Sequence, residues 1–577
     1  MNKLLRLLRG FAVLTTLLVV FYAPQSGVVA ANNSETVSAT TSKGSKTNGN
    51  KTSAQAPAPA PAPKPSSPPA AAEFENKIKE FQEYVSTARK KWKCPGVSIG
   101  IIANGKVYFV NDGVANVDTG KKITEDSIFC VMSLSKVITV SVVQQLVDEG
   151  KLNLDDPVTN YLPWFKLSAG TQDVKVRHLI SHCIGLPKFA ADTLWHLGFT
   201  QKEIIEKLGI IPVCAPPGEK YAYQNMFVGI AGLLIESILK KPLRDIVQER
   251  IFEKLGMEHS SMGPHPTGFW GKIKQFFKKE KKHDPDLLVT GYINYGGPAV
   301  SVSTDEPYLF EGTSGVNSST ADYLKFIACL INGGIIESGV NAGTALLSQR
   351  AMKEMTSKQI AISDIRNNSS HFPVERMEKG SFYYGNGIFG FNYGTDTKKA
   401  KVIMHEGAGA GWRSIWMILP EHNFGFVVLT NYGSINSNLL PEAIAYQLLD
   451  LYLNIPGHNW NDWFYKSFLS SKKYFKHRFD AYVLGPPPPL ESLSGKYKSE
   501  IYGALTIVQK GGGLVAEYRG RDVPLKHVGG TVFSFDANKL TVRYGDDDYG
   551  ELYFQRQGNK VDGLKVGLLR EDDFKKS

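Results

Sequence analysis

Two patterns of apolar and polar residues follow one another along the chain. Residues 97–103 and 107–110 are apolar runs, and the Asn104-Gly105 pair between them is a strong signal for a tight turn that joins two strands. Helical periodicity with long loops then dominates residues 125–300. The other expected elements of this part are helices at 74–91 and 439–453 and apolar, β-branched strands at 402–404, 415–419 and 424–429. Strands at both ends with helices between them predict one sheet that is interrupted by a helical subdomain.

The second pattern begins after the four consecutive prolines at 486–489. Apolar and polar residues alternate there in short runs, and glycine-rich turns separate several of them. The expected strands are 505–509, 514–518, 532–536, 540–544 and 551–555. This alternation predicts a small β-sandwich or β-barrel at the C-terminus. Together the two patterns predict an α+β protein with a separate, all-β tail.

The N-terminal composition predicts that the protein is exported. Basic residues within the first nine positions precede a short apolar core at 11–23, and small residues at 28–31 offer a cleavage site, so residues 1–30 are typical of a signal peptide. The core is shorter than the roughly 20 apolar residues that span a membrane. A periplasmic or secreted protein is therefore expected, and retention in the inner membrane by an uncleaved signal is the alternative. Residues 31–73 form a Ser/Thr- and Ala/Pro-rich linker that cannot bury a core.

The net charge indicates which partners to expect, and the cysteine count indicates whether disulfides are expected. The net charge of +11 favours anionic surroundings such as lipid headgroups or wall polymers, but without a patterned basic face it does not indicate nucleic acid. An insertion at 272–282 carries six lysines around Phe276-Phe277. It is either a contact with anionic membrane or a solvated loop. Five cysteines are an odd, low count that does not form a disulfide framework, so packing is their expected use.

Ser133-Leu134-Ser135-Lys136 carries the first candidate chemistry. It opens an apolar run that predicts a buried helix ending near Gly150. Positions i and i+3 are neighbours on a helix, which places Lys136 within reach of the Ser133 hydroxyl. A serine is a weak nucleophile until a nearby base takes its proton, and burial would lower the pKa of Lys136 toward that of a useful base. The alternative for this common pattern is a helix start with a surface lysine.

Tyr223-Gln224-Asn225 is the second candidate, directly before another apolar run. A tyrosine can act as a base or a proton shuttle if a neighbouring cation lowers its pKa from about 10. Asn225 can donate to a substrate carbonyl or hold a lysine through its amide oxygen. The alternative is a half-buried tyrosine that packs at a helix start.

His405-Glu406-Gly407-Ala408 is the third candidate, immediately after a predicted strand. Gly407 would let a substrate backbone lie close to the strand, and the N–H of Ala408 could join that of Ser133 in an oxyanion hole. His405 can hydrogen-bond a substrate or tune Tyr223. The alternative is a surface histidine in a glycine-rich turn.

In this order, S-x-x-K, Y-x-N and H-x-G resemble the motifs of the beta-lactamase-related serine hydrolases of the class C type. That family includes class C beta-lactamases, D-alanyl-D-alanine carboxypeptidases, D-aminopeptidases and related esterases. Further stretches that look like loops typical of the family are 155–158, 179–187, 314–322 and 384–387. The resemblance implies a beta-lactamase/penicillin-binding-protein-like antiparallel sheet flanked by helices. The implied organisation is a hydrolase domain at 74–456, a helical connector and Pro-rich linker at 457–489, and a lipocalin-like β domain at 490–577.

The third motif departs from the family pattern, because His405 leads it where Lys-Thr-Gly is usual. That change removes the fixed cation and hydroxyl that hold a penicillin carboxylate, so the resemblance does not extend to strong beta-lactamase activity. Cys183-Ile184 also replaces the usual Thr-Ser of its loop.

The function implied is hydrolysis of an amide or ester bond through an acyl-enzyme. Ser133 would attack the carbonyl, and Lys136 and Tyr223 would move the proton. The expected substrate-binding residues are Asn225, His405, Gly407 and Ala408. No metal or cofactor is implied, and the expected partner is a small-molecule or peptide substrate, such as a D-amino-acid peptide, ester, beta-lactam or cell-wall peptide. The alternative is a penicillin-binding-like sensor or scaffold with little or no turnover.

Overall fold

The computed structural model describes most of the chain after residue 70. The described residues are 71–263, 285–293, 300–302, 310–363, 371–433, 438–478, 485–540, 549–558, 560–567, 569 and 572–577. The predicted signal peptide, nearly all of the linker and the basic insertion at 272–282 lie outside them. Among the helices of the described part, none combines the length and apolar character that crossing a membrane requires.

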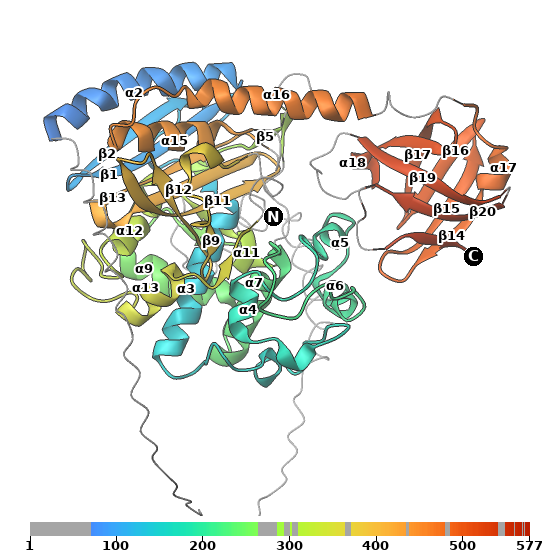
Figure 1. Cartoon of the computed structure of the whole chain (residues 1–577), viewed down its shortest axis with the longest axis horizontal. Helices are drawn as coiled ribbons and strands as arrows, with labels where there is room; N and C mark the ends of the chain where they lie inside the picture. Colours follow the sequence, from blue (N-terminus) through green and yellow to red (C-terminus); the bar gives the residue numbers. More distant parts are fainter. Residues whose placement is uncertain are drawn as a thin grey trace, which may run out of the picture. The chain divides into compact units, whose positions relative to one another are not determined.

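An eight-stranded antiparallel sheet organises the N-terminal part of the described chain (Figure 1), with the strand order β2-β1-β13-β12-β11-β10-β9-β8. Its early and late strands meet where β1 pairs with β13, with Ile99 opposite Val428. The bounds are β1 Gly96–Ala103, β2 Lys106–Gly113, β8 Ile360–Ala361, β9 Tyr383–Tyr384, β10 Phe389–Gly394, β11 Lys399–Gly409, β12 Trp412–Leu419 and β13 Phe424–Thr430. The antiparallel sheet interrupted by helices is therefore confirmed.

Strand β11 is longer than the sequence pattern predicted. The expected strand covered only the apolar residues 402–404. In the structure β12 pairs with β11 as far as Gly409, which lies opposite Trp412. On the other edge of β11 the pairing with β10 ends earlier, at Met404, which lies opposite Phe389. The third motif therefore lies within the strand, at a point where one edge of β11 has lost its neighbour.

Helices cover both faces of the sheet (Figure 1). Helix α2 and helix α15 pack together on one face, and α16 packs against α15. Helix α12 lies against β1 and β13 on the other face, which also supports the helical subdomain. The bounds are α2 Ala71–Lys91, α12 Thr320–Ile331, α13 Gln349–Thr356, α15 Leu440–Tyr452 and α16 Trp460–Arg478. Each apolar side of the sheet is thus removed from water, as its nearly continuous apolar strands require.

The helical subdomain is built around α3, which is apolar on most of its surface. Every residue of α3 from Ser135 to Leu146 is buried. A helix with so little polar surface belongs in the interior of a domain. The subdomain's helices are α3 Ser135–Asp148, α4 Val176–Ile180, α5 Asp192–His196, α6 Gln201–Leu208, α7 Asn225–Leu239, α8 Leu243–Val247, α9 Glu253–Leu255 and α11 Glu311–Ser314. Small strands accompany them: β3 Phe129–Cys130, β4 Ser261–Met262, β5 Tyr292–Ile293, β6 Val300–Ser301 and β7 Val316–Ser318.

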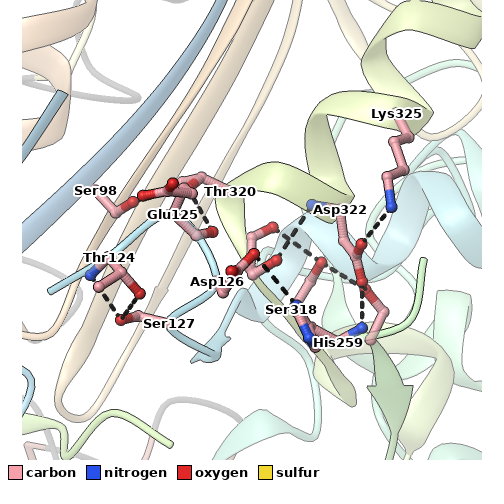
Figure 2. Close-up of polar contacts among 12 residues, drawn as sticks. Ser98, Thr124, Glu125, Asp126, Ser127, His259, Ser318, Thr320, Asp322 and Lys325 are labelled. Carbon is pink, nitrogen blue, oxygen red and sulfur yellow. Dashed lines mark hydrogen bonds and ion pairs between the residues drawn. The ribbon is translucent and has the colours of Figure 1, made fainter. Parts of the chain in front are cut away.

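A buried polar cluster fastens the start of α12 to its surroundings (Figure 2). The Asp322 carboxylate accepts a hydrogen bond from the His259 backbone N–H at 2.6 Å and another from the Ser260 hydroxyl at 3.0 Å. In the same region the hydroxyl oxygens of Ser98 and Thr320 lie 2.7 Å apart, which joins β1 to the first residue of α12. Buried polar groups with partners of this kind fix a unique arrangement. The cluster thereby holds the segment that includes β7 in place beside the sheet.

The C-terminal tail forms a closed β-barrel of strands β14 to β21, in chain order. Their bounds are β14 Gly495–Ser499, β15 Gly503–Lys510, β16 Gly513–Tyr518, β17 Arg521–Gly529, β18 Val532–Asp536, β19 Tyr549–Gln557, β20 Lys560–Val566 and β21 Phe574–Lys576, with helices α17 Leu490–Leu493 and α18 Ala537–Leu540. The predicted barrel is confirmed. The strand expected at 540–544 is wrong at its first residue, since Leu540 ends α18, and its other residues lie outside the described part. The domain boundaries stay predictions.

Candidate active site

Ser133 lies in a tight turn immediately before α3 rather than inside it. The chain leaves β3, passes Val131, and enters a 3-10 turn over Met132–Leu134. Met132 has a φ of +51°, a left-handed conformation that is costly for a residue with a side chain. A side chain of the neighbouring strand β12 holds the turn, because the Ser414 hydroxyl donates a hydrogen bond to the Val131 carbonyl at 2.8 Å. This strained, well-supported turn presents the half-buried Ser133 side chain at the N-terminal end of the helix.

Lys136 and Ser133 meet as their spacing predicts. The Lys136 ammonium nitrogen Nζ lies 2.7 Å from Ser133 Oγ. Burial lowers the pKa of Lys136 to about 7, and the negative charge of Asp192 opposes this shift. A substantial fraction of Lys136 is therefore uncharged near neutral pH and able to accept the serine proton. The sequence-based hypothesis of a surface lysine is wrong, because Lys136 is fully buried.

Asn225 holds the lysine from a second side. Lys136 Nζ donates to Asn225 Oδ1 at 2.9 Å and to the Thr313 carbonyl at 3.3 Å. Thr313 in turn donates its hydroxyl proton to the Asn225 carbonyl at 2.6 Å. Of the two uses considered for Asn225, the structure places it on the lysine. Three oxygen atoms, Ser133 Oγ, Asn225 Oδ1 and the Thr313 carbonyl, thus fix the position of Nζ, so that the amine is aimed at the nucleophile and cannot swing away.

Tyr223 completes the group around the nucleophile. Its ring centroid lies 5.1 Å from Lys136 Nζ, and its phenol is hydrogen-bonded to Ser133. Burial raises the pKa of Tyr223 well above its usual value, although the hydrogen bond to Ser133 opposes the rise. The lowered pKa considered from the sequence is therefore not found in the free protein. A neutral phenol in this position can donate a proton and pass one on, but it is a poor primary base.

His405 is buried beside these residues and has partners at both ring nitrogens. Its Nδ1 lies 2.6 Å from the Glu406 carbonyl, which can only accept, so Nδ1 carries the proton. Nε2 therefore accepts from the Tyr384 hydroxyl at 3.0 Å. Burial, aided by the charge of Lys136, lowers the pKa of His405 to about 3, so the ring is neutral. His405 holds Tyr384 in the free protein, and a direct contact with a substrate would require Tyr384 to move.

Gly407 lies directly against the nucleophile turn. A Cβ at this position would be 2.5 Å from the Val131 carbonyl oxygen and 3.1 Å from the Ser133 nitrogen. The glycine was expected to make room for a substrate backbone, but the protein's own turn occupies that space. Gly407 is thus required for β11 to approach Ser133. The role of the next residue, Ala408, as an oxyanion-hole donor stays a prediction.

Sequence reasoning missed two aromatic neighbours of the site. The His182 ring centroid lies 4.2 Å from that of Tyr223 and 4.6 Å from that of Tyr384. His182 is fully buried and has a φ of +56°. His182 and Tyr384 lie in two stretches, 179–187 and 384–387, that the family resemblance had singled out, and that resemblance was the only signal for them. Their roles depend on contacts between distant segments, which no local pattern reports.

A buried ion cluster behind the third motif was also missed. Arg413 Nε lies 2.8 Å from a Glu442 oxygen, and each of these side chains is about 1% exposed. The same guanidinium lies 3.4 Å from Glu406, which is also 3.4 Å from His371 Nδ1. Although burial opposes the shift, His371 and Arg413 lower the pKa of Glu406, so its carboxylate is charged. Removing one member of such a buried cluster would leave an uncompensated charge, so its members are held firmly together. The cluster therefore rigidifies the strand that carries the third motif.

Within the described residues, no group of three or more histidine, cysteine, aspartate or glutamate side chains could hold a metal ion. The polar side chains around Ser133 instead form one connected hydrogen-bonded group of nucleophile, amine and phenol. This arrangement can transfer a proton from a serine to a lysine, which is the chemistry of an activated serine nucleophile.

Residues 76–449 match the Beta-lactamase family, and the chain belongs to that family. It is 24% identical over 476 residues to the unguisins hydrolase ungD of Aspergillus violaceofuscus, with 77% of each chain covered. It is 25% identical over 364 residues to protein flp of Staphylococcus aureus, with 62% of this chain and 63% of that protein covered. Members of this fold include serine hydrolases that work through an acyl-enzyme.

Solved structures share the fold at low identity. An octameric penicillin-binding protein homologue from Pyrococcus abyssi is 22% identical, with a TM-score of 0.51 over 86% of this chain and all of that chain. A class C beta-lactamase is 19% identical, with a TM-score of 0.51 over 67% of this chain and 99% of that chain. The beta-lactamase/penicillin-binding-protein-like fold inferred from the three motifs is therefore confirmed.

Proposed function

We propose that the protein is an exported serine hydrolase that cleaves an amide or ester bond through an acyl-enzyme on Ser133. The observation that carries the proposal is the 2.7 Å contact between Ser133 Oγ and the buried amine of Lys136, whose pKa is about 7. A surface ion pair or a structural lysine has no need of a lowered pKa, whereas a general base does. The name of the related unguisins hydrolase also supports hydrolysis.

Acylation would begin with transfer of the Ser133 hydroxyl proton to the uncharged Lys136 amine. Ser133 Oγ then attacks the substrate carbonyl, and the carbonyl oxygen becomes an oxyanion held by the backbone N–H groups of Ser133 and Ala408. As the bond to the leaving group breaks, Tyr223 donates its phenolic proton to the leaving nitrogen or oxygen. The Lys136 ammonium replaces that proton, so both residues return to their starting states.

Deacylation would reverse the same proton path with water. The Lys136 amine accepts a proton from the water, directly or through the Tyr223 phenol, as the water attacks the acyl carbonyl, and that proton returns to Ser133 Oγ as it leaves. The hydrogen bond between the Tyr223 phenol and Ser133 supports this relay, because it already connects the two groups in the free protein. The reaction consumes one water and needs no metal or cofactor.

The substrate class that we propose is short esters or D-amino-acid peptides, including fragments of cell-wall peptide. His405 stands where the family usually has a lysine, and its pKa of about 3 keeps it neutral at physiological pH. A neutral ring that is already bonded to Tyr384 offers no fixed cation for a substrate carboxylate. Penicillins depend on such a cation, so they are expected to be poorer substrates.

A panel of p-nitrophenyl esters, D-Ala-D-Ala peptides and nitrocefin tests this preference. We expect kcat/KM for at least one ester or peptide to exceed that for nitrocefin by about tenfold or more, since one lost ionic contact costs on the order of 1.4 kcal/mol. The Ser133→Ala variant supplies the blank for each substrate. A higher kcat/KM for nitrocefin than for every other compound would show that the interpretation of the third motif is wrong.

The same panel separates the enzyme from the penicillin-binding-like sensor or scaffold. An enzyme releases many equivalents of product per protein, and a sensor that is acylated without turnover releases at most one. Product that stops at one equivalent for every compound would favour the sensor.

Export is tested by the N-terminus of the mature protein in its native cells. We expect intact mass and N-terminal sequencing of the extracytoplasmic fraction to give a chain that begins near residue 31, since small residues at 28–31 follow the apolar core. A chain that keeps Met1 and remains with the inner membrane would instead support the anchored alternative. A full-length chain in the cytosol would contradict export.

A further inference from the structure

Asp192 lies at the far end of a chain of hydrogen bonds that starts at the nucleophile. Ser133 Oγ is hydrogen-bonded to Lys136 Nζ at 2.7 Å, and Lys136 Nζ donates a hydrogen bond to Asn225 Oδ1 at 2.9 Å. Asn225 Nδ2 then donates to Asp192 Oδ2 at 2.6 Å. Asp192 belongs to none of the three motifs, and it is the first residue of helix α5, more than thirty residues before Asn225.

The chemistry of the two side chains explains what this last bond does. A carboxylate can only accept hydrogen bonds, so the Asn225 side chain must turn its NH2 group toward Asp192. Its oxygen then faces the opposite way, toward the Lys136 amine. Without Asp192, an amide could turn over and present two donor protons to a group that is itself a donor. Asp192 thus decides which end of Asn225 meets the lysine.

The loop that leads into Asp192 is shaped for this contact. Phe189 and Ala191 have φ values of +61° and +65°, a left-handed conformation that costs about 1 kcal/mol or more for each residue with a side chain. The Phe189 N–H donates to the Tyr223 carbonyl at 2.7 Å, and the Asp192 N–H donates to the Phe189 carbonyl at 3.1 Å. The loop is therefore fastened to the Tyr223-Gln224-Asn225 segment at both its backbone and its acidic side chain.

We propose that Asp192 is a positioning residue for acylation, which holds Asn225 in the orientation that keeps the Lys136 amine on Ser133. The proposal rests on the proposed function in one respect, namely that Ser133 is the nucleophile. Asp192 does not touch the reacting atoms, and it acts through Asn225.

Asp192 also contributes charge to the lysine site. Burial is the largest cause of the lowered pKa of Lys136, and the Asp192 carboxylate opposes it. The other titratable groups around the lysine come from three different segments. Tyr223, His182 and His405 are uncharged near neutral pH, because burial shifts each of their pKa values toward the neutral form, and Glu406 is the further charged group near Tyr223. Loss of the Asp192 charge should therefore move the titration of Lys136 to lower pH.

Two substitutions separate the charge from the hydrogen bond. Asp192→Asn removes the charge but keeps an oxygen that can accept from Asn225, whereas Asp192→Ala removes both. The measurement is the rate of labelling of the full chain by a small fluorophosphonate between pH 5 and pH 9. Asp118→Asn is the matched control, since Asp118 is an exposed residue outside the site.

We expect the acidic limb of the Asp192→Asn profile to move to lower pH by at least about 0.3 unit, with a plateau rate within about threefold of wild type. Asp192→Ala should lower the plateau rate by about 10- to 100-fold, and Asp118→Asn should match wild type. Profiles for both Asp192 variants that coincide with wild type would overturn the proposal. If Asp192→Ala does not fold, as judged by circular dichroism, Asp192→Ser takes its place, because its shorter side chain loses the 2.6 Å contact with Asn225 Nδ2, and a plateau rate equal to that of wild type would then overturn the proposal. Wild-type protein that is not labelled at Ser133 would instead contradict the proposed function, and the role of Asp192 with it.

Discussion

Replacing Ser133 by alanine should abolish turnover of every substrate and labelling by a fluorophosphonate or a fluorescent penicillin. The expected loss in turnover is at least about 10⁴-fold, because removal of a serine nucleophile also disables the base that serves it. Ser133 Oγ lies 2.7 Å from Lys136 Nζ and is hydrogen-bonded to Tyr223. Alanine removes only one oxygen from a half-buried position, so the fold should remain. Intact mass after labelling is the direct measurement.

Ser135→Ala is the control, since this serine is the direct neighbour of Lys136 in sequence. Its hydroxyl donates to the Met132 carbonyl at 2.6 Å and accepts from the Val316 N–H at 2.9 Å. It is therefore a fully buried structural group, and its loss should cost about 1–3 kcal/mol of stability while labelling persists. Equal labelling of wild type and Ser133→Ala would show that the nucleophile is another residue.

The elements of the fold that could be predicted from the sequence were those with strong local signals. The Asn104-Gly105 pair correctly predicted the hairpin between β1 and β2, because few other dipeptides fit the turn. Apolar, β-branched runs located β12 and β13 to within a few residues. The contact between Ser133 and Lys136 also follows from a local rule, since three residues separate neighbours on one helix face.

The errors arose where distant segments decide the local structure. Gly407 was expected to make room for a substrate backbone beside a strand that ended at 404, but pairing with β12 extends β11 through it, and the nucleophile turn fills the space beside it. The pKa of Tyr223 was considered only for the effect of a nearby cation, whereas burial by neighbouring segments dominates and acts in the opposite direction. Burial is a property of the whole fold, so a four-residue motif cannot report it.

The same reason explains the residues that were missed. Asp192 meets Asn225 across 33 positions, and Arg413 meets Glu442 across 29. A single aspartate at the start of a helix, or a single arginine in a strand, has no sequence signature until the fold shows what it faces. The motifs therefore supply the reacting groups, while the surrounding groups that orient them become visible only in three dimensions.

The labelling rate of the wild-type protein should rise with pH and level off above about pH 7. Lys136 is charged below its pKa and neutral above it, and only the neutral amine can take the Ser133 proton. Burial lowers the pKa of Lys136 to about 7, so the rate should fall about tenfold per pH unit below that value. If the phenolate of Tyr223 were the primary base, the rise would lie far above pH 7, because burial raises the pKa of Tyr223. The midpoint of the profile thus distinguishes the two candidate bases.

Substitution of Lys136 should have an effect nearly as large as the loss of Ser133. Lys136→Ala removes the base, and Lys136→Arg keeps a positive charge but cannot lose its proton in this pH range. We expect both to slow labelling by at least about 10³-fold at pH 8, and we expect the pH dependence centred near 7 to disappear. A merely electrostatic role for the lysine would let Lys136→Arg retain much of the wild-type rate. Rapid labelling of folded Lys136→Arg, with the midpoint still near pH 7, would therefore assign the base to a different group.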